Sequence, residues 1–352
     1  MTPEDLRAAV AAGIIDEAQA ARLRVLAEGR AGTRAVMPAE DEPFEFFRGF
    51  SEIFISIGLV ILLSGVTAML SWFGGFALLT LVPLIAAGVA WWWARYFTLK
   101  RRMTLPSMVL ASAFGGGVAI FFATALSEMA ISVRAVGVLT FVLTAAALAG
   151  WYRRFRLPFT AALIGISLLL AIYAATTSFE DVVMGDWGWR GMFDLSENPI
   201  FASSTLVFGV GAFLAGMWFD TRDPHRLGRH AATAFWCHLL AAPALVNTVA
   251  VSLLNSGGGM ALMALALLVI TVLALVIDRR SFLTAAIAYI ALVLAWFAGD
   301  DGDYGRWVFI LMTLGALITA IGTWWVQLRA FVMKALPEFP GKSRLPPYAR
   351  PE

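Results

Sequence analysis

The chain has 352 residues, of which 60% are hydrophobic and only 14% are charged, and its net charge is +2. This composition is typical of an integral membrane protein, and it leaves no room for a large soluble domain. The single cysteine, Cys237, excludes a disulfide framework.

The amino-terminal part is polar and is expected to lie in the cytoplasm. Residues 1–29 are predicted to form a small helical hairpin, because Thr2 and Asp16 can cap two short helices that end at Gly13 and Gly29. Such a unit is too small to bury a core of its own. We therefore expect it to pack against the membrane domain, against a second copy of the chain or against a protein partner.

Residues 30–52 are predicted as a linker and interfacial segment, and residues 53–326 as a transmembrane domain. This domain contains ten apolar stretches of roughly 20 residues, the length of helix that crosses a hydrocarbon core of about 30 Å. Helices are required because lipid cannot satisfy the backbone of an open sheet. The predicted fold class is all-α, a polytopic transmembrane helix bundle of about ten spans with a small N-terminal helical hairpin. The expected spans are 53–72, 76–96, 105–126, 134–152, 157–175, 200–219, 231–253, 259–277, 282–298 and 307–326.

The loops between these stretches alternate in charge. Those that follow even-numbered stretches are basic, as at residues 100–102 and 153–156, whereas those that follow odd-numbered stretches are neutral or acidic. By the positive-inside rule the basic loops, both termini and a tail at 327–352 lie in the cytoplasm. Tryptophans near the ends of the stretches, such as Trp151 and Trp325, are predicted as interfacial anchors.

Three segments carry a family resemblance: residues 13–20 (GIIDEAQA), residues 57–65 (IGLVILLSG) and residues 113–120 (AFGGGVAI). Together they resemble a bacterial family of multi-spanning membrane proteins of unknown function in which a short cytoplasmic helical hairpin precedes the membrane helices. The resemblance covers roughly residues 1–130. It implies the fold described above and a multi-pass location in the bacterial inner membrane, but no activity.

The predicted spans contain almost no ionisable side chains, and His238 is the exception. With its neighbour Cys237 and with Asn247 it forms a candidate intramembrane polar site. His238 and Asn247 are nine residues apart and so lie on nearly opposite faces of one helix. Structural hydrogen bonds between helices are one interpretation, and a substrate or proton site is the other. No metal site is expected, because adjacent side chains diverge around a helix.

Two other features are candidate sites. The triplet Gly115, Gly116 and Gly117 predicts close helix packing, or alternatively a locally unwound helix that exposes carbonyl groups. The outer loop at 176–199 is expected to lie on the membrane surface or to cap an outward-facing cavity, and the acidic outer loop at 299–306 is expected to be solvated with a weak preference for cations. Their candidate residues are Trp187, Trp189, Asp300, Asp301 and Asp303.

No catalytic, phosphate-binding or dinucleotide motif is present in the sequence, so we expect neither an enzyme nor a cofactor. Anionic headgroups explain the basic loops, so membrane lipids rather than nucleic acid are the expected partners. The first functional hypothesis is a scaffold or accessory subunit of a membrane complex. The alternative is a transporter or flippase of a weakly polar or lipid-like substrate.

Overall fold

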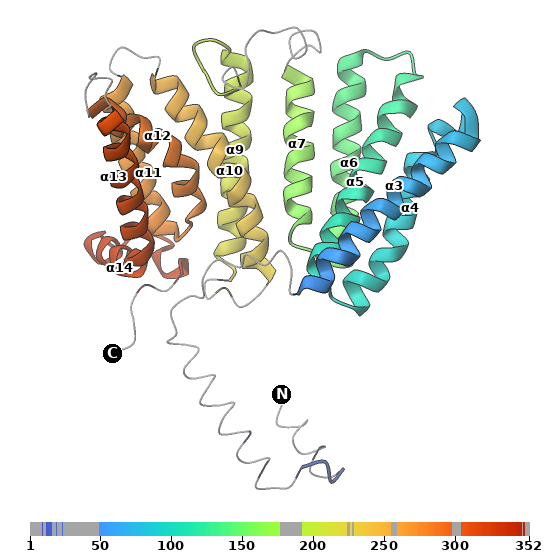
Figure 1. Ribbon diagram of the computed structural model, residues 1–352, viewed down its shortest axis with the longest axis horizontal. Helices are drawn as coiled ribbons and strands as arrows, with labels where there is room; N and C mark the ends of the chain where they lie inside the picture. Colours follow the sequence, from blue (N-terminus) through green and yellow to red (C-terminus); the bar gives the residue numbers. More distant parts are fainter. Residues whose placement is uncertain are drawn as a thin grey trace.

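The computed structural model describes residues 49–176, 192–223, 226, 229–254, 259–297, 304–346 and 348, with a few positions between 9 and 23. All regular structure in these residues is helical, so the predicted all-α class is confirmed. The helices stand side by side and alternate in direction, which makes a wide bundle (Figure 1).

The first half of the bundle runs from α3 to α7, with α3 on its outer edge (Figure 1). A π-helical segment, η1, continues α4 and places basic residues at the helix end. Ser132 starts α6, because its side chain accepts a hydrogen bond from the Ala135 backbone N–H at 3.2 Å. The elements are α3 (Phe50–Leu79), α4 (Val82–Ala94), η1 (Arg95–Lys100), α5 (Thr104–Ser127), α6 (Val133–Phe155) and α7 (Thr160–Thr176).

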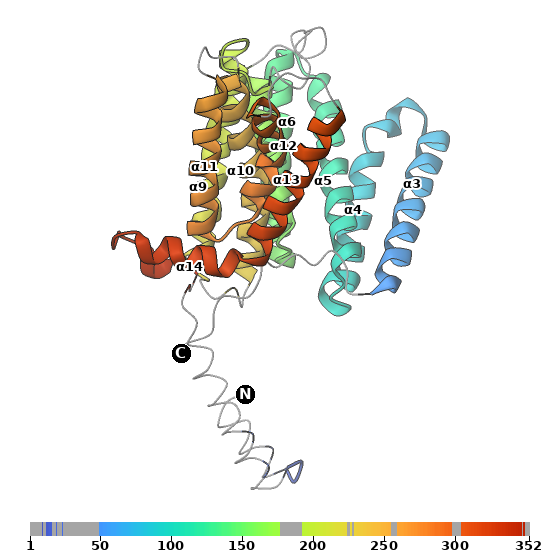
Figure 2. The ribbon, with the colours of Figure 1, turned by 60° about the vertical axis from the view of Figure 1, so that its left-hand side comes forward.

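The second half of the bundle runs from α9 to α14. Asn198 caps α9 by accepting a hydrogen bond from Phe201 N–H at 3.3 Å. The last helix, α14, is bent by 72° from α13 and lies across the end of the bundle (Figure 2). The elements are α9 (Pro199–Asp220), α10 (Arg229–Leu254), α11 (Gly259–Ile277), α12 (Ser281–Phe297), α13 (Tyr304–Thr323), α14 (Trp325–Ala335) and the short 3₁₀ turn η3 (Lys342–Arg344).

Within the described residues, 5 helices are long and apolar enough to cross a membrane, and α13 with α14 makes a sixth if the bent pair counts as one span. The 5 are α3, α5, α6, α9 and α10. Between them stand shorter apolar helices such as α7, whose 17 residues extend about 26 Å. The described part of the chain is therefore helical with several helices that could span a membrane, and the predicted number of ten spans is larger than this length criterion alone supports.

The core of the first half is built from aromatic rings. Trp151 on α6 is completely buried, and its ring packs against those of Trp91, Phe114 and Phe155 with centroid distances of 4.5 to 5.4 Å. Trp325 is also buried, at 2% exposure. The prediction that these two tryptophans are interfacial anchors is therefore wrong, because each one packs inside the protein.

Two of the three glycines in the α5 triplet allow neighbouring helices to pack closely, and α5 is a continuous helix through the triplet. A Cβ atom on Gly117 would lie 2.5 Å from the backbone oxygen of Pro83 on α4, and one on Gly115 would lie 3.2 Å from Leu148 on α6. Gly116, in contrast, has nothing within 4 Å. Gly117 thus sets the distance between α4 and α5.

This geometry gives a prediction with a built-in control. We expect Gly117→Ala to lower stability by about 1–3 kcal/mol, because the new methyl group collides with backbone that cannot rotate away. Gly116→Ala should leave stability unchanged or raise it by up to ~1 kcal/mol through helix propensity. Thermal unfolding in a mild detergent measures both variants. Equal unfolding temperatures would contradict the packing role of Gly117.

Candidate functional site

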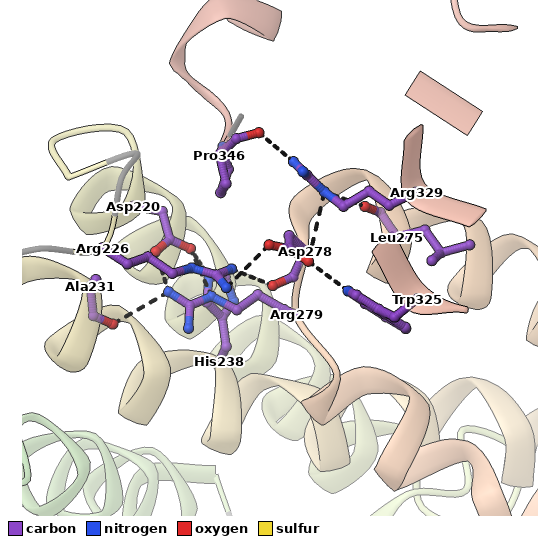
Figure 3. A network of polar contacts seen from close by, with 10 residues as sticks. All are labelled: Asp220, Arg226, Ala231, His238, Leu275, Asp278, Arg279, Trp325, Arg329 and Pro346. Atoms are coloured by element: carbon purple, nitrogen blue, oxygen red, sulfur yellow. Dashed lines mark hydrogen bonds and ion pairs between the residues drawn. The ribbon is translucent and has the colours of Figure 1, made fainter. Parts of the chain in front are cut away.

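A group of buried charged side chains lies where α9, α10, α11 and α14 meet, at the basic end of the bundle (Figure 3). Asp220, the last residue of α9, accepts two hydrogen bonds from Arg279, one of them from Nε at 3.1 Å. Its Oδ2 atom also lies 2.9 Å from Nε2 of His238 on α10. A carboxylate only accepts, so Nε2 of His238 is the donor. Asp220 therefore joins α9 to α10 and to the connection between α11 and α12.

The second carboxylate of the group is Asp278, which precedes Arg279 in that connection. Arg226 pairs with Asp278 Oδ2 at 3.1 Å, and Trp325 on α14 donates from Nε1 to Oδ1 at 2.6 Å. Arg329, also on α14, lies 3.7 Å from Oδ1 and donates hydrogen bonds to the backbone oxygens of Leu275 and Pro346. Asp278 thus ties α14 and the chain that follows it to the end of α11.

These charges are removed from solvent. Asp220, Arg226, Arg279 and Arg329 are 3%, 6%, 0% and 3% exposed, respectively. Moving ions from water into a protein interior costs several kcal/mol each unless pairing and hydrogen bonds compensate. Here two carboxylates face three guanidinium groups that also bond backbone oxygens. We interpret the group as a structural clamp across the second half of the bundle.

His238 occupies a specific recess within this clamp. Its side chain is fully buried, and a Cβ atom on Gly216 of α9 would lie only 2.7 Å from the imidazole ring. The absence of a side chain at Gly216 is what lets the ring reach Asp220. Among the described residues, the Nδ1 atom of His238 has no hydrogen-bond partner. The geometry therefore fits the imidazole tautomer whose proton is on Nε2 and whose Nδ1 carries none.

The structure separates the other predicted polar residues from His238. Cys237 lines an apolar groove, while Asn247 is half-buried further along α10. Arg226, Arg279 and Arg329 belong to segments that the charge pattern assigns to the cytoplasmic side, and that pattern did not predict that all three side chains are buried. The candidate residues of the outer loops, Trp187, Trp189, Asp300, Asp301 and Asp303, lie outside the described residues.

The apolar groove lies between α6, α7, α9 and α10 and has a volume of about 710 Å³. Its walls are almost entirely aliphatic, and small residues keep it open, among them Gly165, Ala171, Gly211 and Ala215. Several lining side chains are exposed at the side of the bundle, Val207 by 67%. The groove therefore opens sideways, toward the surface that lipid would cover.

Few polar atoms face this groove, and they gather at one end of it. The hydroxyl groups of Tyr152 on α6 and Thr233 on α10 lie 3.1 Å apart, and both residues line the groove. Val138, at the other end, is 14 residues from Tyr152 on the same helix, which corresponds to about 21 Å. One leaflet of a bilayer supplies about 15 Å of hydrocarbon. The groove is thus longer than a single leaflet is thick.

No family model, no curated protein and no solved structure matches this sequence. The function considered below therefore depends on the chain's own residues and geometry.

Proposed function

We propose that this protein is a ten-span bacterial inner-membrane protein with both termini in the cytoplasm, and that it carries a lipid-like molecule in the groove between α6, α7, α9 and α10. A transporter or flippase of such a substrate is the function that this geometry supports best. The observation that carries the proposal is the laterally open apolar groove of about 710 Å³.

The dimensions of the groove support a hydrocarbon chain as its occupant. Its walls expose apolar atoms, so a polar solute would lose hydration there without gaining hydrogen bonds. Its length of about 21 Å exceeds the thickness of one leaflet, about 15 Å. A chain held in this groove would reach past the midplane of the bilayer, which is what movement between leaflets requires.

The packing around the groove also supports a moving part. α6 packs extensively on α7 and α9 on α10, whereas the contact between α7 and α9 is much smaller. Gly211 and Ala215 on α9 face the groove with little or no side chain. The smaller contact between the pairs is where a hinge or shear movement would occur, and this movement would separate the stacked rings of Tyr173 on α7 and Phe201 on α9.

Ten spans follow if the shorter helices cross the membrane with the longer ones. α7, with 17 residues, stands between the full-length helices α6 and α9 (Figure 1). A helix of this length is within the range of about 17–25 residues that span a bilayer. The connections α4–α5, α6–α7, α9–α10 and α11–α12 all lie at the end of the bundle that carries α14 (Figure 1), and these are the connections with basic residues.

An accessory subunit of a larger complex is the second proposal, and it depends on the predicted hairpin 1–29. Most of that segment lies outside the described residues. The scarcity of ionisable side chains in the predicted spans also favours a role without transport, but the buried ion pair of Asp220 and Arg279 weakens this argument.

Blocking the groove tests the main proposal. A Cβ atom on Gly211 meets nothing within 4 Å, so Gly211→Leu should fill the groove without disturbing the helices. Gly150 on α6 has equally open surroundings but does not line the groove, which makes Gly150→Leu the matched control. We expect wild type and the control to retain phospholipid through detergent purification, and Gly211→Leu to retain roughly tenfold less by mass spectrometry. Equal retention by the two variants, or none by wild type, would refute the proposal.

A further inference from the structure

A second pocket of about 710 Å³ lies at the basic end of the first half of the bundle, and its walls are polar. The described residues that line it include five arginines and no acidic residue: Arg102, Arg153, Arg154, Arg156 and Arg229. They come from four segments, namely the η1–α5 connection, the end of α6, the α6–α7 connection and the start of α10. All five arginines are exposed to the pocket and the solvent.

The orientation of the protein in the membrane does not by itself explain why five arginines surround one pocket. The positive-inside rule accounts for arginines in these loops, and the C-terminal end of α6 favours Arg153 and Arg154 through the helix dipole. Neither effect requires side chains from distant segments to surround one cavity. Arg229 is 75 or more positions from the α6 arginines in sequence, yet it lines the same pocket.

Two of these arginines occupy backbone positions that usually carry glycine. Arg102 and Arg156 have φ angles of 53° and 52°, in the left-handed region. Arg156 is the residue that ends α6, where its N–H bonds the Tyr152 oxygen at 2.8 Å. Glycine adopts this conformation more readily than any other residue. An arginine at both places fits a requirement for the guanidinium groups themselves.

A carboxylate near this pocket, that of Glu52, is not among the lining residues and so does not neutralise the arginines there. Glu52 on α3 is 5% exposed, and its Oε2 atom accepts hydrogen bonds from the N–H groups of Thr104 and Leu105, each at 3.1 Å. Glu52 therefore caps the N-terminal end of α5. An anion in the pocket would be held by the arginines rather than by this helix end.

The arginine pocket adjoins the apolar groove along three pieces of chain. Tyr152 lines the groove and Arg153 the pocket, and on α10 Thr233 lines the groove one turn after Arg229. Thr233 even donates its hydroxyl hydrogen to the Arg229 backbone oxygen at 2.9 Å. In the α6–α7 region, Pro158 lines the pocket and Ala161 the groove. The arginine pocket and the apolar groove are therefore adjacent surfaces that complement a ligand with a negatively charged headgroup and an apolar chain.

We infer that this pocket binds the phosphate headgroup of an anionic phospholipid of the cytoplasmic leaflet, whose acyl chain lies in the apolar groove. The inference depends on the proposed function and names its substrate class. Arginine suits a phosphate because the planar guanidinium donates two parallel hydrogen bonds to its oxygens. Basic pockets between helices on the cytoplasmic side are a known mode of headgroup recognition.

Headgroup selection by the full-length protein tests the inference. Purified protein is equilibrated with vesicles of equal parts phosphatidylglycerol and phosphatidylcholine, re-isolated, and its bound lipids are quantified by mass spectrometry. We expect wild type to favour phosphatidylglycerol by at least about tenfold, and Arg153→Gln/Arg229→Gln to reduce this preference to near equality. The control Arg95→Gln/Arg222→Gln removes the same charge at the same end of the bundle from residues that do not line the pocket, and it should keep the preference.

The possible outcomes separate the two proposals. Lipid retained without a headgroup preference, or a preference that survives in the pocket variant, overturns the inference and leaves the groove proposal standing. Failure of wild type to retain any lipid refutes the groove proposal itself. Arginine-dependent binding of inorganic phosphate without phosphatidylglycerol preference would show a free-anion site and overturn the lipid assignment. If Arg153→Gln/Arg229→Gln unfolds, Arg102→Gln/Arg154→Gln applies the same test.

Discussion

Asp220→Asn should be among the most destabilising conservative substitutions in this protein. The amide keeps the size of the side chain but removes the charge that pairs with Arg279, which is 0% exposed. Removing one partner of a buried ion pair leaves an uncompensated buried charge and costs about 3–5 kcal/mol. We therefore expect a large fall in the unfolding temperature, measured by scanning fluorimetry in mild detergent.

Two further variants serve as a control and as a rescue for this measurement. Glu128→Gln makes the same chemical change at an exposed position after α5, and should alter stability by no more than about 0.5 kcal/mol. Asp220→Leu combined with Arg279→Met replaces the whole pair by apolar side chains and should recover much of the loss. If Asp220→Asn unfolds at the same temperature as Glu128→Gln, the pair does not act as a clamp.

Cysteine labelling in intact cells should give opposite results at two positions. Ser196 precedes α9 and Lys334 lies on α14, and both residues are exposed. Five predicted spans separate them, so they should face opposite sides of the membrane. In a Cys237→Ala background, Ser196→Cys should react with a membrane-impermeant maleimide. Lys334→Cys should react only after permeabilisation, because positively charged loops are retained in the cytoplasm.

The labelling pattern also reports on the number of spans. Reaction at Lys334→Cys alone would reverse the proposed orientation. Reaction at both positions in intact cells would mean an even number of crossings between them, so that a helix in this region does not span. Solubilised protein should react at both positions, which is the control for chemical access.

The helix positions were predictable because apolar side chains are more stable in lipid than in water, so a long apolar stretch in the sequence directly indicates a membrane helix. The expected stretches 105–126 and 200–219 agree with α5 and α9 to within one residue at each end. Breaks inside apolar sequence were not predictable in the same way. The stretch 307–326 was expected as one helix, but it bends at Trp324, where α14 leaves the bundle. The bend depends on contacts of Trp325 and Arg329 with distant chain.

The burial of these charged side chains was not predicted, because which charges pair depends on how segments distant in the sequence pack together. Asp220 and Asp278 each come directly after an expected apolar stretch and look like ordinary loop residues. A signal was nevertheless available, since they are acids at the start of loops in which basic residues predominate. Likewise, Gly165 and Gly211 were visible as small residues, but only the packing of α7 against α9 and α10 reveals that a groove opens there.

The order in which the clamp is completed has a consequence for biosynthesis. Arg226 and Asp278 leave the ribosome before Trp325 and Arg329, which supply the remaining side-chain contacts of Asp278. Until α14 has been made, the carboxylate at the end of α11 therefore lacks two of its partners. We therefore expect the second half of the bundle to be completed by the docking of α14, because a chain that ends before Trp325 contains an acid without these two partners.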